Sequence, residues 1–558
     1  MITFIISHLS ILVHIFTKSL RIFPVFLTFL TNSMLYTEYA LLFYVYPLSF
    51  TELPVFSRKK FSIGLICGTL GCRAIYFHPQ GKYQRLEPLP YHTYLLGRCF
   101  MYKIDFNNPI HVHFIGIGGI SMSGLAEVLL KERFTISGSD SQASALTREL
   151  EAGGASIYIG QRASNIQEGT DLVVYTAAIH PDNPEFMQAV ALGIPTLSRA
   201  ELLGQMMDNY ARSITVSGTH GKTTTTSMVA HILLAAQADP TISIGGILNA
   251  IGGNIRVGSS DLFLTEACEY TNSFFHFYPK YNIILNIEED HMDFFKDLAD
   301  IRNSFRRFAQ NTSDNGVLIL NSEIEAPEEI TAGLAAKVVN YGTQGNEDYH
   351  ATDISYNEFG CASFMANTPA GSFPITLSVP GEHNVFNALS AIAFGCEAGF
   401  SKEDITAGLL AFGGTVRRFE VKGHLGNVTV VDDYAHHPTE ISATLTAAKN
   451  FPHDRIICVF QPHTYTRTKA FWKDFAEALS KADIVVMADV YAARETDTLG
   501  VRSEDLANDI AKLGTESYYF AGFDEIENFL LEKCMNNDLL ITMGAGDVYK
   551  IGENLLGL

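Results

Sequence analysis

The sequence is poor in basic residues, with 39 Lys and Arg against 60 Asp and Glu and a formal net charge of -21. Such a chain repels nucleic acid and anionic membrane surfaces, so neither is an expected partner. Cysteine is also scarce, with 8 residues in 558. Because no CxxC pair occurs, a disulfide framework and a structural zinc site are not expected. Both shortages favour a cytoplasmic protein without a stable membrane partner.

Uninterrupted hydrophobic runs are short, even in the apolar first hundred residues. The uncharged runs there (1–17, 22–37 and 39–51) are broken by Lys18, Arg21 and Glu38, and each is shorter than the ~20 residues of a spanning helix. Three interpretations of residues 1–100 stay open: a membrane-associated extension, an extra soluble domain, or a start codon assigned too early. The last, with translation beginning at Met101, is favoured.

Hydrolase signatures are missing too, since neither GxSxG nor HExxH occurs. From residue 110 onward, short apolar strands instead alternate with helical segments joined by glycine-rich turns. This alternation predicts an α/β fold with parallel sheets. It occurs in three blocks, which we assign to domains at 101–212, 213–414 and 415–558.

The first block has the layout of a nucleotide-binding βαβ unit. A strand at 111–115 leads into Gly116, Gly118 and Gly119 and then a helix, and a second strand at 134–137 ends at Ser139 and Asp140. Backbone amides at such a helix start can hold phosphates. Ser121 stands where GxGxxG has its third glycine, so a tight turn that binds nothing remains an alternative.

The second block contains a phosphate-loop pattern between a strand at 213–217 and a helix. Glycines let backbone amides wrap phosphates, a lysine neutralises the β and γ oxygens, and a threonine hydroxyl reaches Mg²⁺. All are present, in a loop shorter than Walker A. The segment consists of Gly218, Thr219, His220, Gly221, Lys222, Thr223 and Thr224.

Acidic and imidazole side chains follow two further strands of this block. Glu266 ends a strand at 262–265, and His291 follows a strand at 283–285. Ligands of open parallel sheets lie outside the carboxyl ends of the strands, so both are candidate ligands for a hard cation beside the phosphate loop. Further on, His383, Asn384 and Asn387 begin a helix and could either hold a purine edge or simply start that helix.

The third block also gathers polar residues at strand ends. Strands at 428–431, 456–460, 484–487 and 539–542 end in polar or glycine-rich clusters. A fold without a ligand would scatter these residues over both ends of its sheet. This bias predicts a second ligand-binding edge.

Together these segments resemble the Mur ligase family from about Met101 to the C-terminus. The resemblance implies an N-terminal Rossmann-like domain for a UDP-sugar, a central P-loop ATPase with a parallel sheet, and a C-terminal Rossmann-like domain that closes over the site. Its most specific motifs are HFIGIGGISMSGLAE (113–127), SGTHGKTTTT (217–226), NIEEDHMD (286–293), GEHNVFNALSA (381–391), RRFE (417–420), DDYAHHPTEI (432–441), QPHTYTRT (461–468) and MGAGD (543–547).

The resemblance also implies a reaction: ATP- and Mg²⁺-dependent ligation of L-alanine to UDP-N-acetylmuramate through an acyl phosphate. The glycine turn, Ser139 and Asp140 would hold the UDP-sugar, and residues 218–224 the ATP phosphates. Thr223, Glu266 and His291 would ligate magnesium, and His383, Asn384 and Asn387 would lie near adenine. The residues assigned to the closing domain are Arg418 and Asp433 for the nucleotide, His436 and His463 as candidate bases, and Tyr465, Arg467 and Arg494 around the substrates.

One segment departs from the family pattern. Glu266-Ala-Cys268-Glu269-Tyr270 replaces the more usual EADES, which puts substrate contacts from Cys268 to Asn272 in question. Three other functions are alternatives: a sister ligase that attaches a preformed peptide to the same sugar, a folate polyglutamylating ligase, and a nucleotide-regulated binding protein or membrane-tethered scaffold. The block at 111–140 counts against the folate ligase, and the strand-end clusters of the third block count against a simple switch.

Overall fold

The computed structural model describes residues 103–558 except 177 and 494, together with four short strands nearer the N-terminus. These four strands belong to a separate compact unit, residues 1–102, and form one sheet in the order β1-β2-β3-β4. The predictions about the rest of residues 1–100 lie outside the described residues. The strands are β1 (Ala40–Leu41), β2 (Ser62–Gly68), β3 (Gly71–Phe77) and β4 (Tyr83–Arg85).

The second unit begins with a five-stranded parallel sheet in the order β7-β6-β5-β8-β9. Continuous burial of β5 explains its run of apolar residues, since a parallel strand is covered on both faces. The strands are β5 (His111–Ile115), β6 (Thr135–Asp140), β7 (Ser156–Ile159), β8 (Leu172–Tyr175) and β9 (Thr196–Ser198). The helices are α3 (Ile120–Lys131), α4 (Ala145–Ala152), α5 (Pro184–Leu192) and α6 (Arg199–Met207), with the short η1 (Ala163–Asn165).

A ten-stranded sheet follows, in the order β12-β11-β13-β10-β14-β15-β16-β17-β18-β19. Pairing is parallel from β11 to β17 and antiparallel at both ends. The parallel strands are β10 (Arg212–Ser217), β11 (Thr241–Leu248), β13 (Leu262–Glu266), β14 (Tyr281–Ile284), β15 (Val317–Asn321), β16 (Lys337–Gly342) and β17 (Tyr349–Tyr356). The antiparallel ones are β12 (Gly253–Arg256), β18 (Cys361–Asn367) and β19 (Phe373–Pro380).

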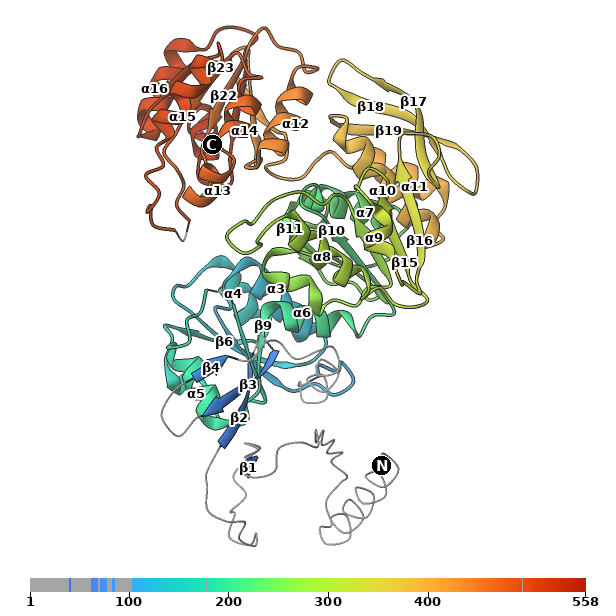
Figure 1. Cartoon of the computed structure of the whole chain (residues 1–558), viewed down its shortest axis with the longest axis vertical. Coiled ribbons are helices and arrows are strands. Elements are labelled where there is room, and N and C mark those ends of the chain that lie inside the picture. Colours follow the sequence, from blue (N-terminus) through green and yellow to red (C-terminus); the bar gives the residue numbers. More distant parts are fainter. Residues whose placement is uncertain are drawn as a thin grey trace, which may run out of the picture. The chain divides into compact units, whose positions relative to one another are not determined.

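Helices of the central sheet build its core. Apolar residues of α7, α10 and α11 form one buried cluster with the strands (Figure 1). Because strand side chains alternate between faces, only every second residue of β18 and β19 joins it. The helices are α7 (Lys222–Ala235), α8 (Leu298–Ala309), α9 (Pro327–Thr331), α10 (His383–Glu397) and α11 (Lys402–Ala411), with η2 (Asn249–Ile251) and η3 (Tyr270–His276).

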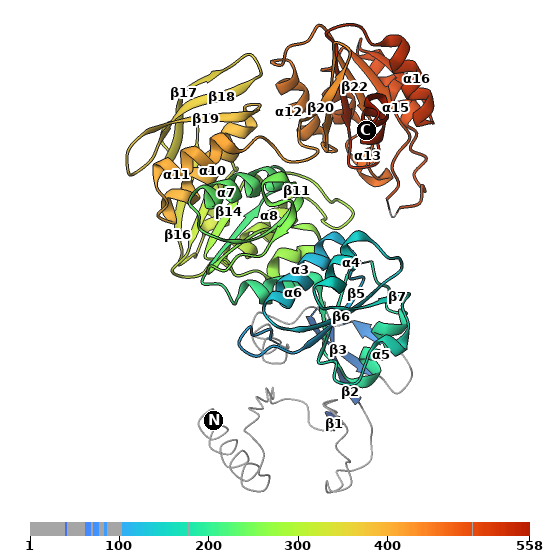
Figure 2. The same cartoon turned by 180° about the vertical axis from the view of Figure 1, so that it is seen from behind.

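The third sheet has six strands in the order β20-β21-β25-β22-β23-β24, antiparallel only between β20 and β21. Alternate residues of β22 enter two apolar clusters, one on each face, and helices cover both faces (Figures 1 and 2). The strands are β20 (Glu420–Leu425), β21 (Val428–Asp433), β22 (Ile456–Phe460), β23 (Ile484–Met487), β24 (Glu516–Tyr519) and β25 (Leu539–Met543). The helices are α12 (Pro438–Ala448), α13 (Tyr465–Ala470), α14 (Trp472–Leu479), α15 (Ser503–Lys512), α16 (Phe523–Lys533) and α17 (Tyr549–Leu556).

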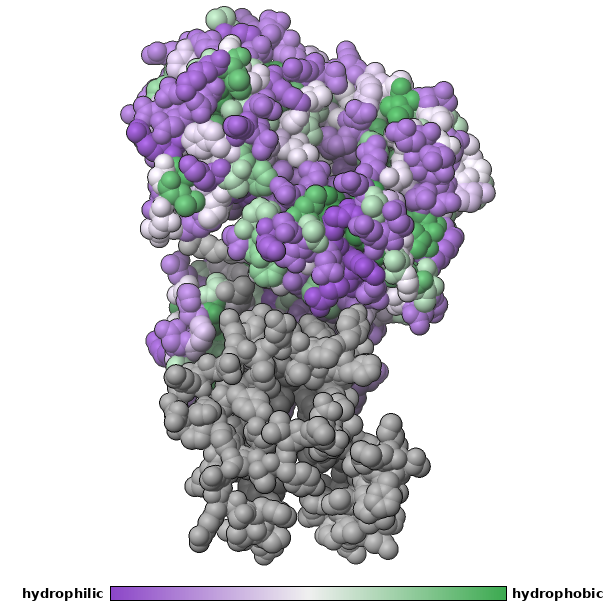
Figure 3. Space-filling view, in the orientation of Figure 1, coloured by the Kyte–Doolittle hydropathy of each residue, from purple (hydrophilic) through white to green (hydrophobic). Residues whose placement is uncertain are grey.

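The predicted fold class is confirmed: the chain is α/β, with parallel-rich sheets in each of its three blocks. On the coloured face in Figure 3, hydrophilic residues predominate and hydrophobic ones are scattered singly or in small groups, as on ordinary protein surfaces. Within the described part of the chain, no helix combines the length and the apolar character that crossing a bilayer requires.

Candidate functional site: a phosphate loop between two sheets

The turn from β10 to α7 has the backbone of an anion-binding loop. Gly218 has φ 142° and Gly221 has φ 83°, values that disfavour a residue with a Cβ. Gly221 is also the N-cap of α7 and has no side chain to accept from the first amides of the helix. Those amides and the positive end of the helix are therefore available to phosphate oxygens.

Replacing Gly221 by Ala is expected to weaken ATP binding. An added Cβ would lie 2.8 Å from Asn387 Oδ1 and 3.3 Å from Leu285 Cδ1, in addition to the strained φ. We expect the KM for ATP to rise about tenfold or more, because the loop must shift. Gly333→Ala is the matched control, since its φ is +79° but nothing lies within 4 Å of the added Cβ. Equal KM values for the two variants would contradict the prediction.

Lys222, the first residue of α7, is held by a carboxylate that the sequence analysis did not assign. Its Nζ donates to Glu269 Oε1 and Oε2 at 3.1 and 2.9 Å and to the Thr219 carbonyl at 3.1 Å. Burial disfavours the charged lysine, but Glu269 outweighs that effect and raises the lysine pKa. Lys222 is therefore cationic at the mouth of the loop, as contact with β and γ phosphates requires.

The three predicted magnesium ligands gather around this lysine. Thr223 is in the first turn of α7, and strand register places Glu266 beside Val216 of β10. The Glu266 carboxylate accepts the Gly245 amide at 2.7 Å. His291 Nε2 lies 3.7 Å from Glu269 Oε1, and its ring packs on Tyr270 with centroids 4.6 Å apart. A hydroxyl and a carboxylate fit the oxygen preference of Mg²⁺, whereas an imidazole is a less usual ligand.

A cavity of about 280 Å³ lies next to the loop. Its wall combines apolar side chains such as Phe386 and Phe412 with polar groups, as nucleotide pockets do. The cavity brings together most of the residues assigned to ATP: His220, Gly221, Thr224, His383, Asn384, Asn387, Arg418 and Asp433. Thr219, in contrast, contacts the segment after β14, where its hydroxyl accepts the Glu288 amide at 2.9 Å.

The last residue of β21, Asp433, reaches this cavity from the third sheet. Its two carboxylate oxygens accept the Ala435 and Phe419 amides at 2.7 and 2.8 Å. Burial raises the pKa of Asp433 from 3.8 to about 6, against the opposing effect of Arg418 and of these amides. The Arg418 guanidinium lies 5.2 Å from the centroid of the Tyr434 ring.

This shifted pKa predicts that Asp433→Asn changes stability in a pH-dependent way. The pKa of Asp433 is higher in the folded state than in the unfolded state, so the protonated carboxyl stabilises the fold. This contribution is complete below pH 3.8 and is lost as the pH rises through about 6. Above that pH the ionised carboxylate costs about 3 kcal/mol. An asparagine cannot ionise. The thermal midpoint of the variant minus that of the wild type should therefore increase between about pH 4 and pH 6. A difference that stays constant over this range would contradict the prediction.

Arg467 of α13 links the third sheet to the central one. Its Nε and Nη2 donate to Asp290 Oδ1 at 3.1 and 3.0 Å, and its Nη1 lies 3.2 Å from His463 Nδ1. The charge of Arg467 helps to lower the pKa of Asp290 against its burial. Asp290 directly precedes His291, so the contact brings α13 to the segment with the candidate metal ligand.

The two candidate bases lie side by side in this region, with the rings of His436 and His463 5.7 Å apart. Burial lowers the pKa of His436 to about 3, so the imidazole is neutral at neutral pH. Its Nδ1 lies 2.9 Å from the Tyr434 carbonyl, which can only accept a hydrogen bond. The ring proton of His436 is therefore on Nδ1, and Nε2 keeps a lone pair. The Tyr465 amide donates to Glu495 at 2.8 Å. Arg494 lies outside the described residues.

The glycine turn of the first sheet is tied to the end of β6. The Gly116 amide donates to the Ser139 carbonyl at 2.8 Å, and the Gly118 amide to Asp140 Oδ2 at 2.9 Å. The Ser139 hydroxyl is fully buried and donates to Glu185 at 2.6 Å. Because the Ser139 side chain is buried, Asp140 is the one of these two predicted residues whose side chain could contact a ligand. Gly119 is the N-cap of α3 and has no capping side chain.

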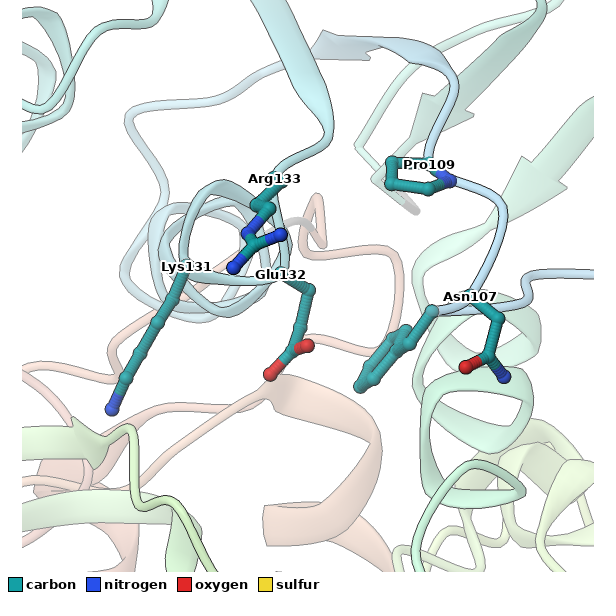
Figure 4. A pocket seen from close by; sticks show the side chains of 6 residues that line it. Asn107, Pro109, Lys131, Glu132 and Arg133 are labelled. Atoms are coloured by element: carbon teal, nitrogen blue, oxygen red, sulfur yellow. The ribbon is translucent and has the colours of Figure 1, made fainter.

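A second cavity, of about 400 Å³, lies between the segment before β5 and the end of α3. Figure 4 shows Asn107 and Pro109 on one side and Lys131, Glu132 and Arg133 on the other. Lys131 Nζ is bonded to the Val257 carbonyl at 2.7 Å. This cavity contains none of the residues predicted from the sequence.

Three acidic residues at the site were not assigned a role from the sequence: Glu269, Glu288 and Glu440. Glu269 lies in the altered segment after Glu266. The other two lie inside the quoted motifs NIEEDHMD and DDYAHHPTEI, and both contact His220. Their position within these motifs could have identified them as candidate site residues. Their convergence on one histidine depends on contacts between distant segments, which the sequence does not show.

The three sheets, the phosphate-loop pattern and the pocket beside it define an α/β protein with a candidate nucleotide site at strand ends. Three family models match successive parts of the chain: Mur ligase family, catalytic domain (111–211), Mur ligase middle domain (216–395), and Mur ligase, glutamate ligase domain (417–546). The chain belongs to the Mur ligase family.

Individual relatives are similar over nearly their whole length. The UDP-N-acetylmuramate–L-alanine ligase of Agathobacter rectalis is 61% identical over 457 residues, which are 82% of this chain and 100% of that protein. The ligase of the same name from Clostridium botulinum is 48% identical over 80% of this chain and 98% of its own length. The crystal structure of UDP-N-acetylmuramate-alanine ligase MurC from Thermotoga maritima matches with a TM-score of 0.67, 29% identity, and coverage of 80% of this chain and 98% of that one.

Proposed function

We propose that this chain is an ATP-dependent ligase that joins L-alanine to the lactyl carboxylate of UDP-N-acetylmuramate, a step in peptidoglycan precursor synthesis. The observation that carries the proposal is the identity of 61% to a ligase of that name, matched over its full length. The clustering of eight residues assigned to ATP around one cavity supports it. Residues 101–212, 213–414 and 415–558 would be the UDP-sugar, ATP and closing domains.

In the first step, a lactyl carboxylate oxygen attacks the γ-phosphorus of ATP. The bond between the γ-phosphorus and the β–γ bridging oxygen breaks, giving ADP and an acyl phosphate. Lys222 and Arg418 would spread the charge of the transition state. A magnesium ion bound by Thr223, Glu266 and His291 would neutralise phosphate oxygens. ATP binding requires that Lys222 exchange its contact with Glu269 for one with phosphate.

In the second step, the neutral amine of alanine attacks the acyl carbon, and phosphate leaves. The α-ammonium must first lose a proton, and His463 or His436 is the proposed acceptor. His436 is neutral and its Nε2 has a lone pair that can accept a proton. Its pKa of about 3, however, makes it a weak base. Acyl phosphates hydrolyse readily, so the contact of Arg467 with Asp290 suits a closure that excludes water.

A phosphate-release assay distinguishes this function from that of the sister ligase. A murein peptide ligase from Psychrobacter arcticus has a similar structure, with a TM-score of 0.59, 26% identity, and coverage of 80% of this chain and 98% of that one. With ATP, Mg²⁺ and UDP-N-acetylmuramate present, we expect L-alanine to stimulate phosphate release and a tripeptide to have little effect. Stimulation by the tripeptide alone would favour the sister function.

The reaction is proposed to be cytoplasmic, where ATP is available. The described cysteines at 268, 361, 396, 458 and 534 are free thiols.

A further inference from the structure

Two imidazoles and a carboxylate converge beside the cavity next to the phosphate loop, which His220 and Glu288 help to line. His220 belongs to the phosphate loop, Glu288 follows β14, and His437 is the N-cap of α12. One ligand atom from each residue can be chosen so that all three lie within 4.8 Å of one another. The two imidazole rings have centroids 4.6 Å apart, and His220 Nε2 is 3.4 Å from Glu288 Oε2.

One histidine nitrogen at this point has unsatisfied bonding capacity. His437 is only 5% exposed and its Nε2 is buried without a hydrogen-bond partner, whereas His220 Nε2 faces Glu288 Oε2 at 3.4 Å. A buried polar atom without a partner costs free energy. A cation that accepted the lone pair of His437 Nε2 would remove that cost, and it could share Glu288 with His220.

The surroundings support His220 as a metal ligand. Its Nδ1 lies 3.2 Å from Glu440 Oε1, so Nδ1 can donate its proton to a carboxylate while Nε2 faces the cluster. That arrangement orients most metal-bound histidines. Glu288 Oε2 is likewise fixed, because it accepts the Thr439 hydroxyl at 2.8 Å. His437 Nδ1 accepts the Thr439 amide at 3.3 Å, which is a long hydrogen bond. An ion on Nε2 would move the ring proton of His437 to Nδ1 and break that hydrogen bond.

We propose that His220, Glu288 and His437 form a binding site for a late first-row divalent cation of the Zn²⁺ type, distinct from the magnesium ligands Thr223, Glu266 and His291. Two imidazole nitrogens and one carboxylate oxygen suit Zn²⁺ and Co²⁺, whereas Mg²⁺ prefers oxygen alone. The ligands come from the phosphate loop and from a helix of the third sheet. A bound ion would therefore fix the two together at the edge of the nucleotide cavity and slow the ligase.

Without an ion, the same residues make an ion-pair network. Burial lowers the pKa of His220, but Glu288 and Glu440 outweigh burial and raise it to about 9. A cation entering the site replaces the proton on His220 Nε2, which passes to solvent, so binding releases a proton. If the cluster is only an ion-pair network, it will bind no transition metal.

Cobalt binding tests the site without any turnover, so its outcome is independent of the proposed function. The untagged full chain, with excess Mg²⁺, is titrated with Co²⁺ and followed by the visible bands of nitrogen-ligated Co²⁺. We expect one equivalent to bind and Zn²⁺ to displace it. Glu288→Gln and His437→Gln should each weaken Co²⁺ binding about tenfold or more. Circular dichroism checks that both variants are folded.

His291→Gln is the matched control, because it removes an imidazole from the proposed magnesium site and leaves this cluster intact. It should keep the cobalt bands and the wild-type affinity. Absence of the bands in the wild type, their persistence in both cluster variants, or their loss in His291→Gln would overturn the proposal.

Discussion

Lys222→Ala is expected to abolish ligation, with kcat lowered by about a thousandfold or more. Lys222 is the first residue of α7 and is cationic beside the amides of the loop, where phosphate oxygens would lie. Its loss removes charge stabilisation where negative charge develops in the transition state. The measurement is phosphate release in the presence of UDP-N-acetylmuramate and L-alanine. Lys337→Ala, on a distant strand of the same sheet, is the control and should keep wild-type turnover.

The structure also shows a side effect that must be separated from catalysis. Glu269 is 2% exposed, and Lys222→Ala leaves its carboxylate without its closest cation. An unpaired buried carboxylate destabilises a fold by a few kcal/mol. The double variant Lys222→Ala, Glu269→Gln removes that charge and should recover stability but no activity. Wild-type turnover in a folded Lys222→Ala variant would show that the loop is not the phosphate site.

Glu266→Gln should cause the second-largest loss, a fall in kcat of about a hundredfold or more. The amide keeps an oxygen that can accept from the Gly245 amide, so the local backbone is preserved while the charge is removed. A neutral ligand binds Mg²⁺ more weakly, and the Mg²⁺ concentration for half-maximal activity should therefore increase.

The control for this variant is Glu397→Gln. Glu397 also makes a local contact, with Lys337 at 2.7 Å, but lies away from the loop. Phosphate release is measured over a range of Mg²⁺ concentrations for both variants. An unchanged Mg²⁺ dependence in Glu266→Gln would exclude Glu266 as a magnesium ligand.

Much of the fold was predictable because parallel strands buried on both faces are continuous apolar runs. The strands expected at 111–115, 456–460 and 484–487 have those bounds in the structure. Others extend slightly further: β21 includes Asp433 and β13 includes Glu266. Polar residues can end a buried strand where the sheet edge faces a ligand site, so the apolar pattern stops before the strand does.

The antiparallel strands β18 and β19 were not predicted. They are half-buried, so their apolar residues alternate with polar ones and make no continuous run. Both pair with their chain neighbours through short turns, in which the Gly360 amide donates to the Asn357 carbonyl and the Gly371 amide to the Thr368 carbonyl.

For the site, the sequence predicted which residues would gather around ATP, and eight of these residues line one cavity. It did not show that Glu269 holds Lys222 or that Arg467 pairs with Asp290. The first contact joins residues 47 positions apart. The second joins residues 177 positions apart in different sheets. Neither follows from periodicity or from a motif.

Oxygen transfer from the sugar acid to phosphate tests the central claim most directly. UDP-N-acetylmuramate labelled with ¹⁸O in its lactyl carboxylate is incubated with ATP, Mg²⁺, L-alanine and the wild-type chain, and the released phosphate is analysed by mass spectrometry. An attack of that carboxylate on the γ-phosphorus predicts one labelled oxygen in each phosphate. Amide product accompanied by unlabelled phosphate would contradict an acyl phosphate formed at the Lys222 loop.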